Sequence, residues 1–155
     1  MLEIGTGTGV SSLWTLAGMP ADGVLTTIDV DPKLHAVAKE ILTRAGISLT
    51  RVRMITGRAL QVLTRLSRGA YDMAVVDGDP GETQAYVELL SPALRPGGLL
   101  VIVHAMCNDS VADPARREPD TVAMREVLRH IQESEEWTAN LLPVGDGLLV
   151  AIKNR

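Results

Sequence analysis

Short apolar runs alternate with amphipathic segments along the whole chain. A short, mostly apolar run predicts a strand, and apolar positions spaced i, i+3, i+4, i+7 predict a helix. The expected strands cover residues 2–4, 24–28, 52–55, 73–76, 99–103, 137–142 and 148–152. The expected helices cover residues 11–17, 32–45, a segment after Gly57, 82–90 and 121–134. This alternation predicts a doubly wound α/β fold, in which helices cover both faces of a mostly parallel sheet.

The clearest helix begins after Asp31, which can cap it, with Pro32 at the first helical position. Its expected apolar face consists of Leu34, Val37, Ala38, Ile41, Leu42 and Ala45, and Gly46 ends it. The helix after Gly57 is expected to bury Leu60, Leu63 and Leu66. His35 and His130 also fall on helices and are interpreted as surface residues.

The C-terminal part of the sequence predicts the strand order. The Gly-Asp-Gly turn at residues 145–147 joins the last two strands too tightly for a crossover, so we expect an antiparallel hairpin. Combined with right-handed crossovers earlier in the chain, this hairpin predicts the sheet order 3-2-1-4-5-7-6, with only the seventh strand antiparallel. Residues 94–98 are expected to form a turn that ends the preceding helix, and residues 108–119 an exposed loop at the mouth of the site.

Length and composition suit a single domain over residues 1–155. The expected strand before the first glycine has only residues 2–4, whereas a strand usually has about five residues. We therefore expect an N-terminal truncation within the first strand, with the helices that would precede it missing.

Several classes of partner are disfavoured by composition. The apolar runs fall far short of the ~20 residues that span a membrane. A net charge of −4, with two Trp, two Tyr and no Phe, offers neither a basic surface nor a stacking surface for nucleic acid. The single Cys107 excludes an internal disulfide, so a cytoplasmic location is the default expectation.

A glycine-rich turn is the first candidate for chemistry. Gly5, Gly7 and Gly9 lie between an expected strand and an expected helix, where the backbone can turn sharply and a ligand can approach closely. Asp29, at the end of the second strand, is placed to accept hydrogen bonds from ribose hydroxyls. Both features suit a cofactor that contains adenosine. The alternative is a tight strand-to-helix turn in which Asp29 is only a loop carboxylate.

Residues 3–9 resemble the E/D-x-G-x-G-x-G motif of class I S-adenosylmethionine (SAM)-dependent methyltransferases, and Val10 stands where a dinucleotide-binding fingerprint has glycine. Residues 94–98 resemble the L-R/K-P-G-G element that precedes the fifth strand in that superfamily. Together the motifs at 2–9, 26–29, 56–59, 75–79 and 94–98 resemble the small O-methyltransferases of the catechol and caffeoyl-CoA type, especially their actinobacterial members.

The resemblance implies a set of cofactor contacts along the chain. They are Glu3, Gly5, Thr6, Gly7, Gly9, Ser11, Asp29, Val30, Arg58, Ala59, Asp77 and Asp79. It implies that Glu3 lies under the cofactor, that the glycine turn and Ser11 hold its amino-acid end, and that Asp29 binds its ribose. Arg58 and Ala59 would border the adenine, and Asp77 would face both the methionine amine and the substrate. A cationic sulfonium and ammonium should indeed be drawn to carboxylates at strand ends.

The chain departs from this family at two positions that matter for mechanism. Members usually bind a divalent metal through the Asp of V-D-x-D and an Asp-Asn pair after the fifth strand, and many carry a lysine base. Here Val103-His104 stands at the pair and Pro80 at the lysine. Because magnesium prefers oxygen ligands, Asp77 with one imidazole predicts no metal site. His104 is then the candidate base, the alternative being a hydrogen-bonded structural histidine, and Cys107 is interpreted as a packing residue.

The sequence therefore predicts SAM-dependent methyl transfer to an oxygen of a small-molecule acceptor, with Asp77 and His104 as catalytic residues. Two alternatives remain: a catalytically impaired SAM-binding or interaction protein, and an NAD(P)-dependent oxidoreductase, which Val10 disfavours. Because relatives cover the region before the first strand with helices and often a second subunit, a full-length form is expected to be able to form a homodimer.

Overall fold

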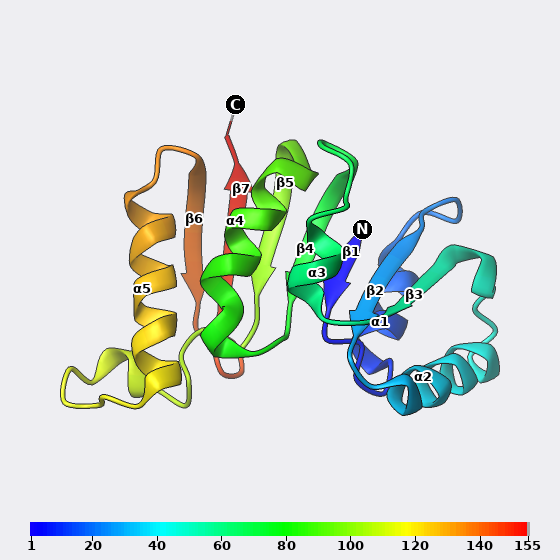
Figure 1. The fold of residues 1–155 in the computed structure, drawn as a ribbon, viewed down its shortest axis with the longest axis horizontal. Helices are drawn as coiled ribbons and strands as arrows, with labels where there is room; N and C mark the ends of the chain where they lie inside the picture. Colours follow the sequence, from blue (N-terminus) through cyan, green and yellow to red (C-terminus); the bar gives the residue numbers. More distant parts are fainter. Residues whose placement is uncertain (155) are drawn as a thin grey trace. The chain divides into compact units, whose positions relative to one another are not determined.

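The computed structural model describes residues 1–154. Their strands form a sheet in the order β3-β2-β1-β4-β5-β7-β6 (Figure 1). The predicted α/β fold class and sheet order are thus confirmed. None of the helices within residues 1–154 has the length and apolar character needed to cross a membrane. The chain divides into two compact units, of which the first spans Met1–Arg65 and the second begins at Leu66; the expectation of one domain stays a prediction.

The first unit contains three parallel strands with helices between them. The strands are β1 (Leu2–Ile4), β2 (Leu25–Asp29) and β3 (Val52–Thr56). The helices are α1 (Val10–Gly18), α2 (Pro32–Arg44), the short 3₁₀ helix η1 (Leu49–Arg51) and α3 (Ala59–Leu63). In the sheet Glu3 pairs with Thr27, which in turn pairs with Met54. Leu16, Leu25 and Leu42 form a buried apolar cluster that joins α1, β2 and α2.

Helix α2 begins as predicted, because the Asp31 side chain accepts a hydrogen bond from the Lys33 N–H and Pro32 stands at its first position. The predicted apolar face is partly wrong. The buried side chains of α2 are His35, Ala38 and Leu42, whereas Val37 is 42% exposed. His35 is therefore not the surface residue that the sequence suggested. The imidazole can be buried because polar side chains bond both ring nitrogens, as described below.

Helix α3 is shorter than expected. It ends at Leu63, which is buried, while Leu60 is only half-buried and Leu66 lies beyond the helix. The prediction that one helical face buries all three leucines is wrong, because the chain leaves the helix at Thr64 before the next turn can form.

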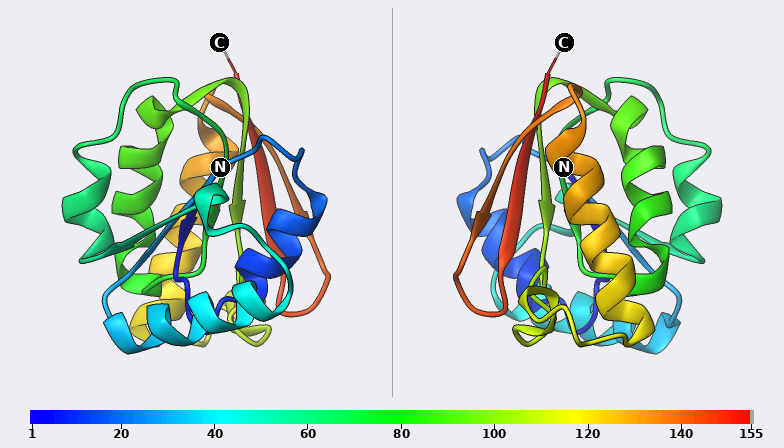
Figure 2. Two further views of the ribbon diagram at one scale, coloured as in Figure 1. Left: turned by 90° about the vertical axis from the view of Figure 1, so that its right-hand side faces the viewer. Right: turned by 90° about the vertical axis from the view of Figure 1, so that its left-hand side faces the viewer.

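The second unit carries the C-terminal part of the sheet. Its strands are β4 (Tyr71–Val76), β5 (Leu94–Ile102), β6 (Trp137–Leu142) and β7 (Leu148–Lys153). Its helices are η2 (Pro80–Glu82), α4 (Thr83–Ala93), η3 (Ser110–Ala112) and α5 (Pro119–Glu133). Strand β7 is antiparallel to both β5 and β6, which confirms the predicted hairpin. Helices α4 and α5 pack side by side on one face of these strands (Figure 2).

Residues 94–98 do not form a separate turn before the strand, as the sequence suggested, but belong to β5. The pairing with β4 shifts there, from Tyr71 opposite Leu94 to Met73 opposite Leu99, so the segment is a bulge. A Cβ atom at Gly98 would lie 2.7 Å from the Arg95 carbonyl oxygen. The bulge therefore needs glycine at position 98. The Pro and Gly residues that suggested a turn form a bulge within the strand instead.

Candidate functional site

The glycine-rich turn connects β1 to α1 in the first unit. Gly5, Gly7 and Gly9 all have positive φ, and Gly9 is the left-handed residue that precedes α1. A Cβ atom on Gly9 would lie 2.8 Å from the Cβ atom of Ala38 in α2. Glycine at position 9 thus satisfies both the backbone conformation and the close approach of α2.

Asp29 closes the turn from the end of β2. One carboxylate oxygen, Oδ2, accepts a hydrogen bond of 2.9 Å from the Gly7 N–H, and Oδ1 accepts one of 3.0 Å from the Asp31 N–H. The carboxylate is half-buried and each oxygen keeps lone-pair capacity for another donor. Asp29 is therefore fixed against the glycine turn and can still accept hydroxyl groups of a ligand.

Glu3 is buried beneath the same turn, with 1% of its surface exposed. Its Oε2 atom accepts hydrogen bonds of 2.5 Å from the Ser12 and Thr27 hydroxyls. Its other oxygen, Oε1, is buried and has no hydrogen-bond partner among residues 1–154. A buried carboxylate oxygen without a donor is costly unless a ligand supplies one, so Glu3 can bind a donor or a cationic group.

His35, a residue of α2, extends the hydrogen-bond network of Glu3 and Thr27. Its Nε2 atom lies 3.0 Å from the Thr6 hydroxyl and its Nδ1 atom 2.9 Å from the Thr56 hydroxyl. The Thr6 hydroxyl also lies 2.6 Å from that of Thr27. Because Thr27 gives its proton to Glu3, it must accept from Thr6, and Thr6 must then accept from Nε2–H of His35. The network thereby assigns the tautomer of His35.

Four further cofactor-binding candidates belong to the first unit: Ser11, Val30, Arg58 and Ala59. Ser11 and Val30 are exposed, and it is the neighbour of Ser11, Ser12, that bonds Glu3. Arg58 precedes α3 with an exposed side chain, and Ala59 is buried at the start of that helix. Hydrogen bonds thus join Glu3 to Thr6 through Thr27, and separately join Gly7 to Asp29. The structure also adds His35 to the first set, a residue that sequence reasoning missed. Three threonines lie in or just after neighbouring strands: Thr6, Thr27 and Thr56. Their hydroxyl groups were the feature of the sequence that could have indicated a buried polar partner such as His35.

In the second unit a cavity of about 400 Å³ opens beyond the ends of β4 and β5. Asp77, directly after β4, and His104, shortly after β5, both line it. Asp79 instead caps η2, because its side chain accepts a hydrogen bond of 2.9 Å from the Gly81 N–H. The two predicted catalytic residues therefore share one cavity.

His104 is held in an uncommon conformation between two carboxylates. Its φ is 55°, in the left-handed region that non-glycine residues seldom adopt. Its Nδ1 atom lies 3.3 Å from Oδ2 of Asp146, and its Nε2 atom lies 3.9 Å from Oδ1 of Asp77. The first distance is a long hydrogen bond and the second is too long for one. Sequence reasoning interpreted residues 145–147 only as a turn and missed Asp146.

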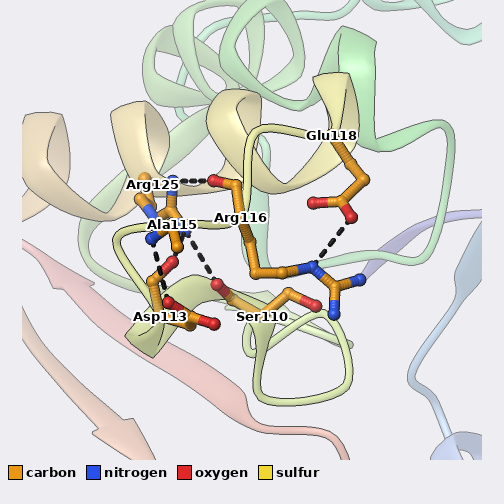
Figure 3. A network of polar contacts seen from close by, with 6 residues as sticks. All are labelled: Ser110, Asp113, Ala115, Arg116, Glu118 and Arg125. Carbon is orange, nitrogen blue, oxygen red and sulfur yellow. Dashed lines mark hydrogen bonds and ion pairs between the residues drawn. The ribbon is translucent and has the colours of Figure 1, made fainter.

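The polar loop after β5 is fixed by α5. Arg125 donates hydrogen bonds to the backbone carbonyls of Ser110, Val111, Asp113 and Arg116. Figure 3 shows this guanidinium among the carbonyls, with Arg116 paired to Glu118. The expectation of an irregular exposed loop over residues 108–119 holds in part, because η3 forms within it and α5 begins at Pro119 rather than near residue 121.

The donor atoms around the cavity do not fit a divalent metal of the magnesium type. Val103 offers no side-chain ligand, and within residues 1–154 no group of three His, Cys, Asp or Glu side chains is arranged to hold a metal ion. Cys107 also lines the cavity, but burial and the nearby Asp146 and Asp120 charges raise the pKa of its thiol. A thiol of raised pKa is a poor nucleophile and a poor metal ligand.

Comparison with known proteins agrees with this geometry. The family model described as O-methyltransferase matches residues 1–154. A protein of Mycobacterium ulcerans that carries an O-methyltransferase name is 48% identical over 152 residues, which are 98% of this chain and 68% of that protein.

Solved structures show the same fold. A protein of Corynebacterium glutamicum superposes with a TM-score of 0.93 at 32% identity, over 99% of this chain and 71% of that one. The O-methyltransferase TomG of Streptomyces achromogenes, solved in complex with SAM, superposes with a TM-score of 0.90 at 28% identity, over 99% and 72% of the two chains. The predicted resemblance is confirmed, and the chain belongs to the O-methyltransferase family.

Proposed function

We propose that this protein transfers a methyl group from SAM to an oxygen of a small-molecule acceptor. The observation that carries the proposal is the buried Glu3 carboxylate, whose Oε1 atom has no donor in the described part of the chain. It lies beneath a glycine turn that Asp29 also lines. A ligand that combines ribose hydroxyls with positive charge suits this pair of carboxylates. Membership of the O-methyltransferase family and the SAM complex of TomG support the choice of cofactor.

Residues of the first unit would hold the cofactor. Glu3 supplies the buried carboxylate, Asp29 accepts the ribose hydroxyls, and the glycine turn from Gly5 to Gly9 lets the amino-acid end of the cofactor approach the backbone closely. Following the family resemblance, we assign Ser11 to the methionine carboxylate, Val30 to the ribose, and Arg58 with Ala59 to the adenine.

Residues of the second unit would act on the acceptor. Bound SAM supplies a methyl group on a positively charged sulfur, which the acceptor oxygen takes as the carbon–sulfur bond breaks. His104 accepts the proton of the acceptor hydroxyl on Nε2, and Asp77 orients the acceptor and the methionine amine. Asp79 shapes the start of η2 beside Asp77. Since the ligand set does not fit a divalent metal, no step is assigned to one.

The acceptor is proposed to be a small molecule rather than nucleic acid or a membrane lipid, and the protein to work in the cytoplasm. The net charge of −4 supports the first statement and the single cysteine the second. We further propose that the protein can form a homodimer. The hypothesis of a nicotinamide-dependent oxidoreductase is not favoured, because the family model and the relatives that match this chain are O-methyltransferases by name.

Two measurements test the proposal. Calorimetric titration with SAM, its demethylated product and NAD⁺ should detect binding of the first two and not of the third. Incubation with methyl-labelled SAM and a panel of catechols and other phenols should transfer label to an acceptor oxygen. Binding of NAD⁺ in preference to SAM would overturn the proposal, and SAM binding without transfer to any acceptor would favour a binding protein that has lost catalysis.

A further inference from the structure

We propose that Asp146 is a positioning residue that sets the tautomer of His104, so that Nε2 is the basic nitrogen presented to the acceptor. The inference rests on the proposed methyl transfer, which makes a base useful in the cavity. Asp146 comes from the β6–β7 hairpin and His104 from the segment after β5, so only the fold brings them together.

The direction of the hydrogen bond follows from the chemistry of the partners. An ionised carboxylate can only accept, so the contact of 3.3 Å between Asp146 Oδ2 and His104 Nδ1 requires the ring proton on Nδ1. In the neutral ring Nε2 then carries the lone pair. That nitrogen is the one nearer Asp77, in a cavity lined by His104, Asp77 and Asp146. The basic nitrogen therefore lies where an acceptor hydroxyl would bind.

Hydrogen bonds hold the hairpin turn against the segment after β5, and they fix the position of the Asp146 carboxylate. The backbone N–H of Ala105 donates to the Gly147 carbonyl at 3.1 Å, and that of Met106 to the Asp146 carbonyl at 2.9 Å. Oδ1 of Asp146 accepts from the Asn108 N–H at 2.6 Å. A Cβ atom on Gly147 would lie 2.5 Å from Cγ of Met106, so this contact tolerates only glycine.

The backbone of the same segment supports a functional reason for this arrangement. His104, Cys107, Asn108 and Asp109 all have positive φ, a conformation that Asn and Asp adopt more readily but that costs roughly 1 kcal/mol at residues such as Cys107. The contacts of the hairpin with this segment help to hold it there. The His104 side chain is 66% exposed, so packing does not account for this conformation, which turns the ring between two carboxylates.

The Asp146→Asn variant distinguishes a role of Asp146 in setting the His104 tautomer from a role in stabilising the loop. The asparagine oxygen can still accept from the Asn108 N–H, while its amide nitrogen must donate to Nδ1 of His104 and so force the proton onto Nε2. We expect kcat to fall by about 10²-fold or more, with little change in the KM for SAM or in thermal stability, because the base would be lost and the loop retained. Nitrogen-15 NMR of the ligand-free protein should show His104 changing from the Nδ1–H to the Nε2–H tautomer.

Asp109→Asn is the matched control, because Asp109 is an exposed aspartate of the same segment with φ of 61°, a conformation that asparagine adopts readily. It should leave tautomer and kcat unchanged. Adding Asp146→Asn to His104→Ala should lower kcat no further than His104→Ala alone, since the positioning residue would have nothing left to position.

Either of two results would overturn the proposal: an Nε2–H tautomer in the wild-type protein, or wild-type kcat in Asp146→Asn after the tautomer has changed. If the wild-type protein binds no SAM, or transfers no methyl group to any acceptor, the proposed function fails instead. The NMR comparison still decides whether Asp146 sets the ring tautomer, so the two failures can be told apart.

Discussion

Replacing His35 with alanine should destabilise the first unit without abolishing cofactor binding. The imidazole is 7% exposed, bonds Thr6 through Nε2 and bonds Thr56 through Nδ1. Loss of the bond at Thr6 costs about 1 kcal/mol, and loss of the bond at Thr56 costs little because that side chain is exposed and water replaces the ring. Lost packing around the removed ring adds about 1–2 kcal/mol.

The sum is roughly 2–3 kcal/mol, which corresponds to a fall in Tm of roughly 5–10 °C for a chain of this length. Thr6 keeps its bond of 2.6 Å to Thr27, so the glycine turn stays anchored and the Kd for SAM should rise by less than about tenfold. Differential scanning calorimetry gives the first quantity and isothermal titration the second.

His130→Ala is the matched control, because His130 also lies on a helix but is exposed at its C-terminal end. Its loss should cost at most about 0.5–1 kcal/mol, through the helix dipole. If His35→Ala lowers Tm no more than His130→Ala does, the buried network contributes nothing to stability and the reasoning fails.

The remaining predictions concern the ligand and the chemistry. Asp29→Ala should weaken SAM binding by roughly 1–3 kcal/mol, because it removes a charged acceptor of ribose hydroxyls and a bond to the Gly7 N–H; calorimetry that finds an unchanged Kd would remove Asp29 from the site. His104→Ala should lower turnover by about 10²-fold or more with SAM affinity little changed, as a proton-accepting role requires, whereas wild-type turnover would leave positioning as the only catalytic device. Methyl transfer should survive EDTA, because Val103-His104 and Asp77 do not make an oxygen-rich site; full inhibition that magnesium reverses would refute the metal-free mechanism.

The sequence by itself determined the order of the elements and the topology of the sheet. Alternation of apolar runs with amphipathic segments, and a turn at 145–147 too short for a crossover, predicted the strand order and the antiparallel β7. These are local signals, since strand length, helix capping at Asp31 and turn chemistry depend on residues close in the chain. The glycine motif also identified the strand-to-helix turn, because its positive φ values admit few other residues. The family was identified from this motif only in combination with those at 26–29, 56–59, 75–79 and 94–98.

Only the tertiary structure decided which polar side chains act together. His35 is at a helical position that the periodicity assigned outside the apolar face, yet Thr6 and Thr56 from separate segments make its burial favourable. Residues 94–98 have the composition of a turn, but pairing with β4 draws them into a strand as a bulge. Asp146 and His104 are 42 residues apart, and the antiparallel return of the hairpin brings them together. Such contacts form only when the fold brings distant segments together. The free energy of burying a polar group depends on whether one of those segments provides a hydrogen-bond partner.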